Sequence, residues 1–400
     1  MLDFPRFRSA HGLRPRDWLP SLSWSHVGNE AELEELAPDA EAVLLRSVSA
    51  SLIGALPPTV RALRLGWCPD VRDDTLALLS GLPALEWLFL DHPLHPELGE
   101  RALEPAAALP KLWGLALRAR PEESRAPWLH SAHLAPLRGR PLRALALSSH
   151  PGLEDLSPLG DLPSLRSLDL TGCPARRGLS ASAVETLFID APLPMAEDTW
   201  SAIGRMERLV RLSACQRTGP LPPLALPALE VAYLFGARGL SVSGPALARL
   251  DLGGGPLPAP AQLSAHGALE AVRLPAHKLG SAHLSAISGV RSVWLSGGAP
   301  RIKPADWRLL SGCRSLVLDC ALRLGRRHLA ALGALRLETL VILRGAERLK
   351  PAELAGLAGL SGAERIHLEG CRDVSGLQAA LPGARVTTEA AALVSEARRG

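Results

Sequence analysis

Several residue types are almost missing from this sequence, and their scarcity limits what the protein can be. Its 400 residues include a single Asn and a single Tyr, and aromatic residues make up 4% of the chain. Lys occurs at only four positions, so the basic side chains are almost all Arg, and the net charge of +4 is small for this length. Such a balance does not indicate a nucleic-acid-binding protein.

Cysteine is also sparse, and its spacing favours reduced thiols over disulfides. The six Cys residues contain no CxxC pair. We expect reduced, buried and structural thiols, as in a cytoplasmic protein.

Long apolar segments are missing as well. The first twenty residues, MLDFPRFRSAHGLRPRDWLP, scatter Arg through the segment and lack the apolar stretch of a secretory signal. The most apolar later run, 221–235, is interrupted by three Pro residues and Glu230, so it is not expected to span a membrane. The sequence therefore predicts a cytoplasmic location and no membrane partner.

Catalytic motifs are absent from the sequence. There is no HExxH, GxSxG or Walker motif, and the glycines at 253–255 lack the spacing of a dinucleotide-binding loop. His130 and His133 have the spacing of two metal ligands on a helix, but no third ligand accompanies them. We interpret them as solvent-exposed loop histidines, and we expect no catalytic residue, no cofactor and no metal.

A short leucine motif is what the sequence does contain. The pattern LxxLxL begins at Val60 and again at Leu85, 25 residues later. Alternate residues of a strand point to opposite faces, so Leu63 and Leu65 are expected in the core while Arg64 faces away. A strand followed by a short helix cannot bury its apolar side alone, so successive units must stack.

The same motif start recurs along most of the chain with a mean spacing of roughly 23 residues. The predicted starts are Ala40, Val60, Leu85, Leu112, Leu142, Leu165, Val184, Leu209, Leu229, Leu247, Leu269, Val290, Cys313, Leu337, Ala363 and Leu381.

Three of these units, VRALRLGWC (60–68), LRSLDLTGC (165–173) and AERIHLEGC (363–371), resemble the LxxLxLxxN/C motif of leucine-rich-repeat proteins. With Cys at the ninth position, the chain resembles a bacterial leucine-rich-repeat protein that is nearest to the cysteine-containing repeat class. The resemblance implies an α/β leucine-rich-repeat solenoid, a horseshoe or arc with a parallel β-sheet on the concave face. Short helices or extended segments would cover the convex face.

The ends of the array are expected to differ from its repeats. We predict an N-terminal cap over residues 1–39, an array of about 16 units over 40–387, and a C-terminal capping helix or tail over 388–400. Within the cap, Asn29 followed three residues later by Glu32 is typical of a helix capping box.

Residues between the framework leucines should project from the concave face toward a partner. Large aromatic and Arg side chains are enriched at interface hot spots, and an apolar patch of this kind is rarely left open. The N-terminal group of candidate partner-binding residues is Arg64, Trp67, Trp87, Phe89, Asp91, Trp113 and Arg118. A second, looser group is Phe188, Tyr233, Phe235, Arg273 and Trp294. The alternative interpretation is that Trp67, Trp87 and Trp113 pack on each other and on the cap.

These patterns favour a non-enzymatic scaffold that binds a protein or peptide through its concave face. Mixed charges on that face, such as Arg166 beside Asp169, suit a folded partner better than a phosphate backbone, so no nucleic acid is expected as a partner. Two alternatives stay open: an inhibitor or immunity-type protein that blocks a partner enzyme, and an accessory enzyme or metal-binding protein using His130, His133 and His150. Self-association is also left open.

Overall fold

A computed structural model describes residues 22–91, 98–119, 129–160, 162–174, 177–179, 183–191, 197–216, 223–235 and 242–389. These residues form two compact units. The N-terminal unit holds the described residues up to 216 together with 224–227, and the C-terminal unit holds residue 223 and the described residues from 228 onward.

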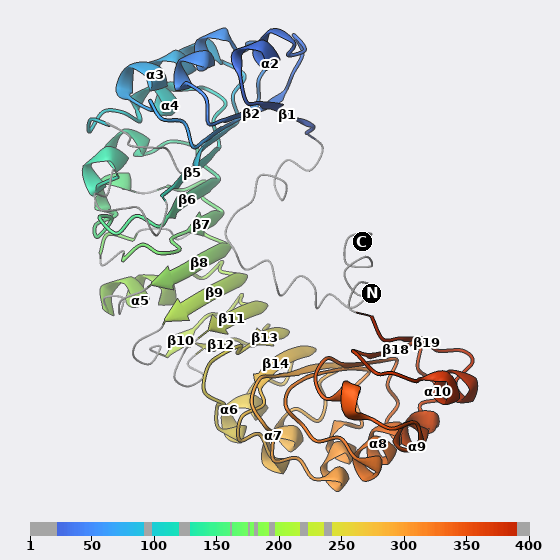
Figure 1. Cartoon of the computed structure of the whole chain (residues 1–400). Coiled ribbons are helices and arrows are strands. Elements are labelled where there is room, and N and C mark those ends of the chain that lie inside the picture. Colours follow the sequence, from blue (N-terminus) through green and yellow to red (C-terminus); the bar gives the residue numbers. More distant parts are fainter. Residues whose placement is uncertain are drawn as a thin grey trace. The chain divides into compact units, whose positions relative to one another are not determined.

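The N-terminal unit contains a parallel sheet whose strands follow the order of the chain (Figure 1). Its strands are β1 (Trp24–Val27), β2 (Ala42–Arg46), β3 (Ala62–Gly66), β4 (Trp87–Asp91), β5 (Gly114–Arg118), β6 (Ala144–Ser148), β7 (Ser167–Asp169), β8 (Thr186–Ala191) and β9 (Arg211–Gln216), with a short β10 (Leu224–Ala225) after them. Its helices are α2 (Glu30–Glu34), α3 (Asp73–Ala77), α4 (Glu104–Ala108) and α5 (Glu197–Gly204), and its 3-10 turns are η2 (Ala50–Ala55), η3 (Leu78–Gly81), η4 (Ser131–Leu137) and η5 (Ser157–Leu159).

The C-terminal unit repeats this arrangement, again with neighbouring strands parallel. Its strands are β11 (Val231–Phe235), β12 (Val242–Ser243), β13 (Arg249–Asp251), β14 (Ala271–Pro275), β15 (Ser292–Ser296), β16 (Ser315–Asp319), β17 (Thr339–Ile342), β18 (Arg365–Leu368) and β19 (Arg385–Thr387). Its helices are α6 (Pro260–Ser264), α7 (Ser281–Ala286), α8 (Arg326–Gly333), α9 (Pro351–Leu354) and α10 (Ser375–Ala380), and its 3-10 turns are η6 (Pro304–Leu310), η7 (Ala346–Arg348) and η8 (Ala355–Gly359).

In each unit the helices and turns lie on one side of the sheet (Figure 1). We call that side the helical side, and we call the opposite side of the strands the sheet face. None of the helices within the described ranges is long and apolar enough to cross a bilayer.

Each of the sixteen predicted motif starts leads into a strand, which usually begins two residues after the start. The delay reflects a backbone corner in which one carbonyl accepts two N–H groups from the next repeat. The Glu41 carbonyl accepts from Arg61 N at 2.7 Å and Ala62 N at 2.9 Å, and the Arg61 carbonyl accepts from Glu86 N and Trp87 N in the same way. The corner uses backbone atoms only, so its second position can hold any residue that has a backbone N–H.

The framework leucines form the core on the helical side of the strands. Leu63, Leu65, Leu88 and Leu90 are all fully buried, while Arg64 between the first two is half-buried on the sheet face. Stacked parallel strands with this alternation, each followed by a short helix or turn, confirm the predicted leucine-rich-repeat fold.

The cysteines at the ninth motif position lie buried under the turn that follows each strand. Cys68 Sγ is 3.7 Å from the Leu45 carbonyl oxygen of the preceding repeat, and Cys173 Sγ donates to the Leu147 carbonyl. Burial raises the pKa of Cys68 to about 11 and that of Cys173 to about 12. The prediction of buried thiols is confirmed for these two and for Cys313, Cys320 and Cys371, whereas Cys215 is half-buried.

Part of the expected N-terminal cap belongs to the sheet. Strand β1 pairs in parallel with β2, from Trp24 opposite Ala42 to Val27 opposite Leu45. Asn29 caps α2, because its Oδ1 accepts the Glu32 N–H at 2.9 Å. Residues 1–21, and residues 390–400 of the expected C-terminal helix, lie outside the described part of the chain.

Candidate functional site

The sheet face of the N-terminal unit is built around two aromatic rings on β4. Trp87 and Phe89 are 0% and 1% exposed. Their ring centroids lie 5.1 Å apart and their planes are 14° from parallel, and the Trp113 ring meets Trp87 edge-on at 5.0 Å. Leu22 and Trp24 pack against the same cluster.

Small residues on neighbouring strands make room for these rings. Gly114 is the cross-strand partner of Trp87, and a Cβ atom there would lie 2.3 Å from the indole ring. Ala62, Ala116 and Ala144 occupy other sheet-face positions of the cluster. The sequence analysis did not consider these positions, although small residues at the third and fifth positions of the motif indicated space for large rings on the neighbouring strand.

The expectation of an open aromatic patch is therefore wrong for Trp87 and Phe89, because both rings are covered. Their expected role as anchors for a partner stays a prediction. Phe188 on β8 packs against this same cluster, so it groups with Trp87 and not with Tyr233 as the sequence suggested.

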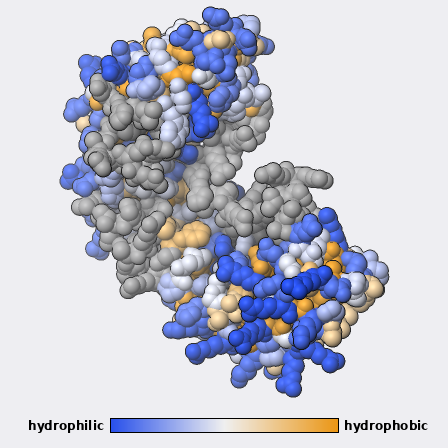
Figure 2. All heavy atoms as spheres, in the orientation of Figure 1, coloured by the Kyte–Doolittle hydropathy of each residue, from blue (hydrophilic) through white to orange (hydrophobic). Residues whose placement is uncertain are grey.

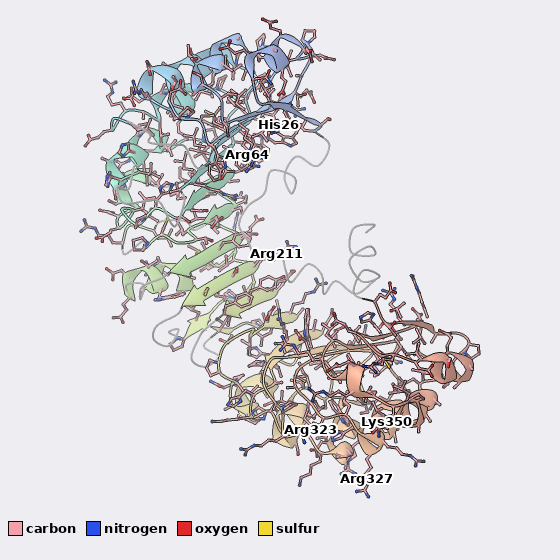
Figure 3. The ribbon with its side chains drawn as sticks, in the orientation of Figure 1. His26, Arg64, Arg211, Arg323, Arg327 and Lys350 are labelled. Atoms are coloured by element: carbon pink, nitrogen blue, oxygen red, sulfur yellow. The ribbon has the colours of Figure 1, made fainter. Side chains whose placement is uncertain are left out.

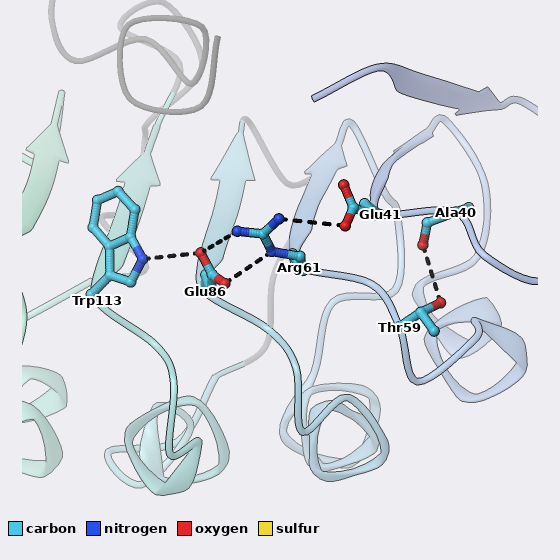
Figure 4. Close-up of polar contacts among 6 residues, drawn as sticks. All are labelled: Ala40, Glu41, Thr59, Arg61, Glu86 and Trp113. Atoms are coloured by element: carbon cyan, nitrogen blue, oxygen red, sulfur yellow. Dashed lines mark hydrogen bonds and ion pairs between the residues drawn. The ribbon is translucent and has the colours of Figure 1, made fainter. Parts of the chain in front are cut away.

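Trp113 is held by an ionic ladder at the strand-entry corner (Figure 4). Its Nε1 donates to Glu86 Oε2 at 3.3 Å, and Glu86 receives two further bonds from Arg61, at 2.9 and 3.2 Å. Arg61 also reaches Glu41 at 3.4 Å. Hydrogen bonding from Arg61 is the main reason why the pKa of Glu86 is lowered. These contacts fix the orientation of the half-buried indole.

The remaining candidates of the N-terminal unit lie toward the ends of the strands. Asp91 is buried and forms an ion pair with Arg64 on the neighbouring strand. Arg118 is half-buried and lies opposite Asp91 in the register of β4 and β5. Trp67 is not on a strand, since it occupies the turn after β3 with a left-handed backbone (φ 62°).

In the C-terminal unit, the strand register places four side chains side by side across the sheet face. Tyr233, Asp251, Arg273 and Trp294 are consecutive cross-strand partners on β11, β13, β14 and β15. Arg273 Nη1 lies 3.6 Å from Asp251 Oδ2, and its Cζ lies 4.3 Å from the centroid of the Trp294 ring. We call Asp251, Arg273 and Trp294 the guanidinium rung.

Asp251 is fully buried, and its environment opposes its ionisation. Its Oδ1 accepts the Gly253 N–H at 2.8 Å. Burial raises the pKa of this carboxyl group, and the Arg273 charge offsets that effect only in part. Gly253 is close-packed here, because a Cβ would lie 2.9 Å from Phe235 Cε1.

Apolar side chains surround the other end of the rung. Trp294 packs with the buried Val317 and Val341, and Tyr233 and Leu343 lie against them. The Arg273 side chain remains 20% exposed. Stacking on an indole and pairing with a carboxylate restrict this guanidinium to one orientation. In that orientation it can donate to a carboxylate of a bound partner.

Two of the histidines considered as metal ligands, His133 and His150, form hydrogen bonds with backbone groups. His133 is buried, which contradicts its expected exposure, and its Nδ1 accepts the His130 N–H at 3.1 Å. His150 Nε2 lies 3.0 Å from the Leu117 carbonyl oxygen. Among the residues that the structure describes, no group of three or more His, Cys, Asp or Glu side chains could hold a metal ion.

The stacked parallel strands and their buried leucines define a leucine-rich-repeat fold. Comparisons with known proteins find solved structures of low identity. TLR13, solved in a complex with ssRNA13, matches at 14% identity and a TM-score of 0.49 over 91% of this chain, which spans 61% of that chain. An internalin from Listeria monocytogenes matches at 16% identity and a TM-score of 0.37, covering 93% of this chain and 92% of that one. A leucine-rich-repeat protein from Leptospira interrogans matches at 14% identity and a TM-score of 0.46, with coverages of 95% and 93%. No family model matches the sequence, and no curated protein does.

Proposed function

We propose that this chain is a non-enzymatic binding protein that holds a protein or peptide against the sheet face of its repeats. The guanidinium rung is the observation that most supports this function. It presents an oriented, partly buried cation on a sheet, stacked on Trp294, and Tyr233 packs against the same apolar cluster as Trp294. Arg and Trp are the residue types that contribute most to affinity at protein interfaces.

The chemistry of the rung selects the group that it would bind. Arg273 has five N–H donors in a planar fork, and Asp251 engages one edge of that fork. A carboxylate of the partner, from an acidic side chain or a chain terminus, would accept hydrogen bonds from Arg273 N–H groups that Asp251 does not engage. In the N-terminal unit, the half-buried Arg64, Trp113 and Arg118 form a separate candidate surface.

The proposal keeps the division that the sequence predicts, with residues 40–387 as the binding array and residues 1–39 and 388–400 as its ends. It also keeps a cytoplasmic setting in a bacterial cell. Strand β1 supports an end-protecting role for the N-terminal segment, since it adds one more strand beside β2.

The test is a selection of short random peptides on the full-length protein, followed by calorimetric titration of each selected peptide. Arg273→Lys keeps a cation beside Asp251 but removes the planar fork, so we expect affinity to fall by about tenfold. Arg291→Lys is the matched control, because Arg291 is exposed at a strand-entry corner. Replacing the carboxylates of the peptide by amides should produce a similar loss.

The proposal is wrong if no peptide is selected, or if the selected peptides bind Arg273→Lys as tightly as the unmodified protein. Circular dichroism of both variants checks that the fold is unchanged. An affinity loss shared equally by Arg273→Lys and Arg291→Lys would also contradict a site at the rung.

A further inference from the structure

The positive charge of this chain is concentrated in one stretch of the C-terminal unit. Residues 301–350 contain 11 Arg and Lys and 4 Asp and Glu, a net charge of +7, whereas the whole chain has a net charge of +4. The other 350 residues therefore sum to −3. All residues of this basic stretch are described by the structure.

These cations form a column that runs over successive repeats of the C-terminal unit. Four of these repeats have a buried apolar residue two positions before their helix or turn begins: Leu279 before α7, Ile302 before η6, Leu324 before α8 and Leu349 before α9. The residue preceding each of them is exposed and basic, namely Lys278, Arg301, Arg323 and Arg348. The Arg301 N–H donates to the Leu279 carbonyl at 2.8 Å, which shows that neighbouring loops of the column touch.

A second set of cations flanks this column. Lys303 and Lys350 directly follow the buried apolar residue of their repeats. Arg326 and Arg327 begin α8 in the repeat between them. Figure 3 shows Arg323, Arg327 and Lys350 on the helical side of the C-terminal unit, and Figure 2 shows hydrophilic side chains protruding from this part of the surface. We call these eight residues (Lys278, Arg301, Lys303, Arg323, Arg326, Arg327, Arg348 and Lys350) the basic ridge.

The ridge has more cations than nearby carboxylates, and two of those carboxylates also accept backbone N–H groups. Asp306 accepts the Lys303 N–H at 2.8 Å, and Glu353 accepts the Lys350 N–H at 2.9 Å, so both acids cap the start of the next helical turn. Arg348 has an exposed ion pair with Glu347 at 3.5 Å. Within the described ranges, no carboxylate forms an ion pair with Arg301, Arg323 or Lys350.

We propose that the basic ridge binds the phosphodiester backbone of a nucleic acid without reading its sequence. Protein interfaces need an apolar centre, whereas a phosphate backbone is bound by Lys and Arg alone. The ridge has cations and no apolar centre. The one exposed large apolar side chain among the described residues, Leu78, lies in the N-terminal unit and not on the ridge. The proposal departs from the sequence-based expectation of no nucleic acid, which rested on the small net charge of the whole chain and on the mixed charges of the sheet face. The ridge lies on the other side of the strands.

The experiment measures fluorescence anisotropy of mixed-sequence single-stranded RNA and duplex DNA with full-length protein, from about 50 to about 200 mM salt. The ridge variant is Arg301→Gln/Arg323→Gln/Lys350→Gln. The control is Lys111→Gln/Arg205→Gln/Arg208→Gln, which removes three exposed cations of the N-terminal unit and changes the net charge equally. All six positions are exposed, so both variants should fold, and circular dichroism verifies this.

We expect the ridge variant to lose at least tenfold in affinity at the lowest salt. The slope of log affinity against log salt should become shallower by about one for each cation removed. The control should keep both the affinity and the slope. Equal losses in the two variants, or no binding of either nucleic acid at the lowest salt, would overturn the proposal. Ridge-dependent binding to mixed phosphatidylcholine and phosphatidylserine vesicles without any binding of nucleic acid would overturn it in favour of a lipid surface.

Discussion

At the scale of single residues, the aromatic cluster of the N-terminal unit is constrained by a glycine. Trp87 is fully buried because its ring lies over the backbone of β5 at Gly114. Van der Waals packing of this density leaves no room for an added methyl group without displacing the ring. The stability of the aromatic cluster therefore depends on a residue that contributes no side chain to it.

Substitution of this glycine tests the arrangement. We expect Gly114→Ala to lower the free energy of unfolding by about 1–3 kcal/mol, the usual cost of overpacking a core. Gly81→Ala is the matched control, since a Cβ at Gly81 would have no neighbour within 4 Å and the backbone there has no positive φ. It should be neutral or slightly stabilising.

Urea denaturation followed by circular dichroism measures both glycine variants. Equal stabilities for the two would contradict the placement of the Trp87 ring over Gly114. The same contact explains why Trp87→Ala cannot serve as a simple binding test: removing a buried ring is expected to cost about 3–5 kcal/mol.

At the scale of the repeat element, the positions of the strands were far easier to predict than the packing of side chains on the sheet face. A strand start depends on the local spacing of leucines and on a corner built from backbone hydrogen bonds, so the motif alone located it. The burial of Trp87 depends on Gly114, which lies on the next repeat, and its effect appears only once β4 and β5 are in register. Arg273 and Trp294 were predictable as sheet-face residues, but the ion pair with Asp251 needed three aligned strands.

The helical elements carry histidines that act as hydrogen-bond acceptors. His328 Nδ1 accepts from Trp307 Nε1 at 3.1 Å, which links α8 to η6, and His283 Nδ1 accepts the Gly280 N–H at the start of α7. Burial lowers the pKa of both side chains below the usual 6.5. Protonation would remove the acceptor in each case.

These lowered pKa values predict that the C-terminal unit loses stability in mild acid. Below pH 6.5 the unfolded chain binds protons that the native histidines resist, so stability is retained above this pH and falls as the pH drops toward the native pKa values. Urea midpoints at neutral and mildly acidic pH measure the loss. His328→Gln keeps an acceptor but does not titrate, so it should reduce the loss.

His277→Gln, at an exposed position, controls for the effect of a His-to-Gln substitution itself. A pH dependence that is identical in the unmodified protein and in His328→Gln would contradict a role for His328.

At the scale of the whole molecule, buried cysteines provide two probes in each unit. Cys68 and Cys173 lie in the N-terminal unit, and Cys313 and Cys320 lie in the C-terminal unit. All four are buried, and burial raises the pKa of each thiol, to about 12 for Cys313 and about 11 for Cys320. A thiol reacts as its thiolate, so inaccessibility and a raised pKa both suppress modification in the native protein.

We therefore expect native protein treated with a thiol reagent at mildly alkaline pH to be modified first at Cys215, the half-buried cysteine. The four deeply buried thiols should react only across the unfolding transition, because modification there requires the strands around each sulfur to separate. Peptide mass spectrometry at increasing urea gives the extent of labelling at each site, and Cys215→Ser should abolish the early reaction. Modification of Cys173 or Cys313 in the absence of urea, at the rate of Cys215, would show that the stacked repeats open locally and that the burial of these thiols does not protect them.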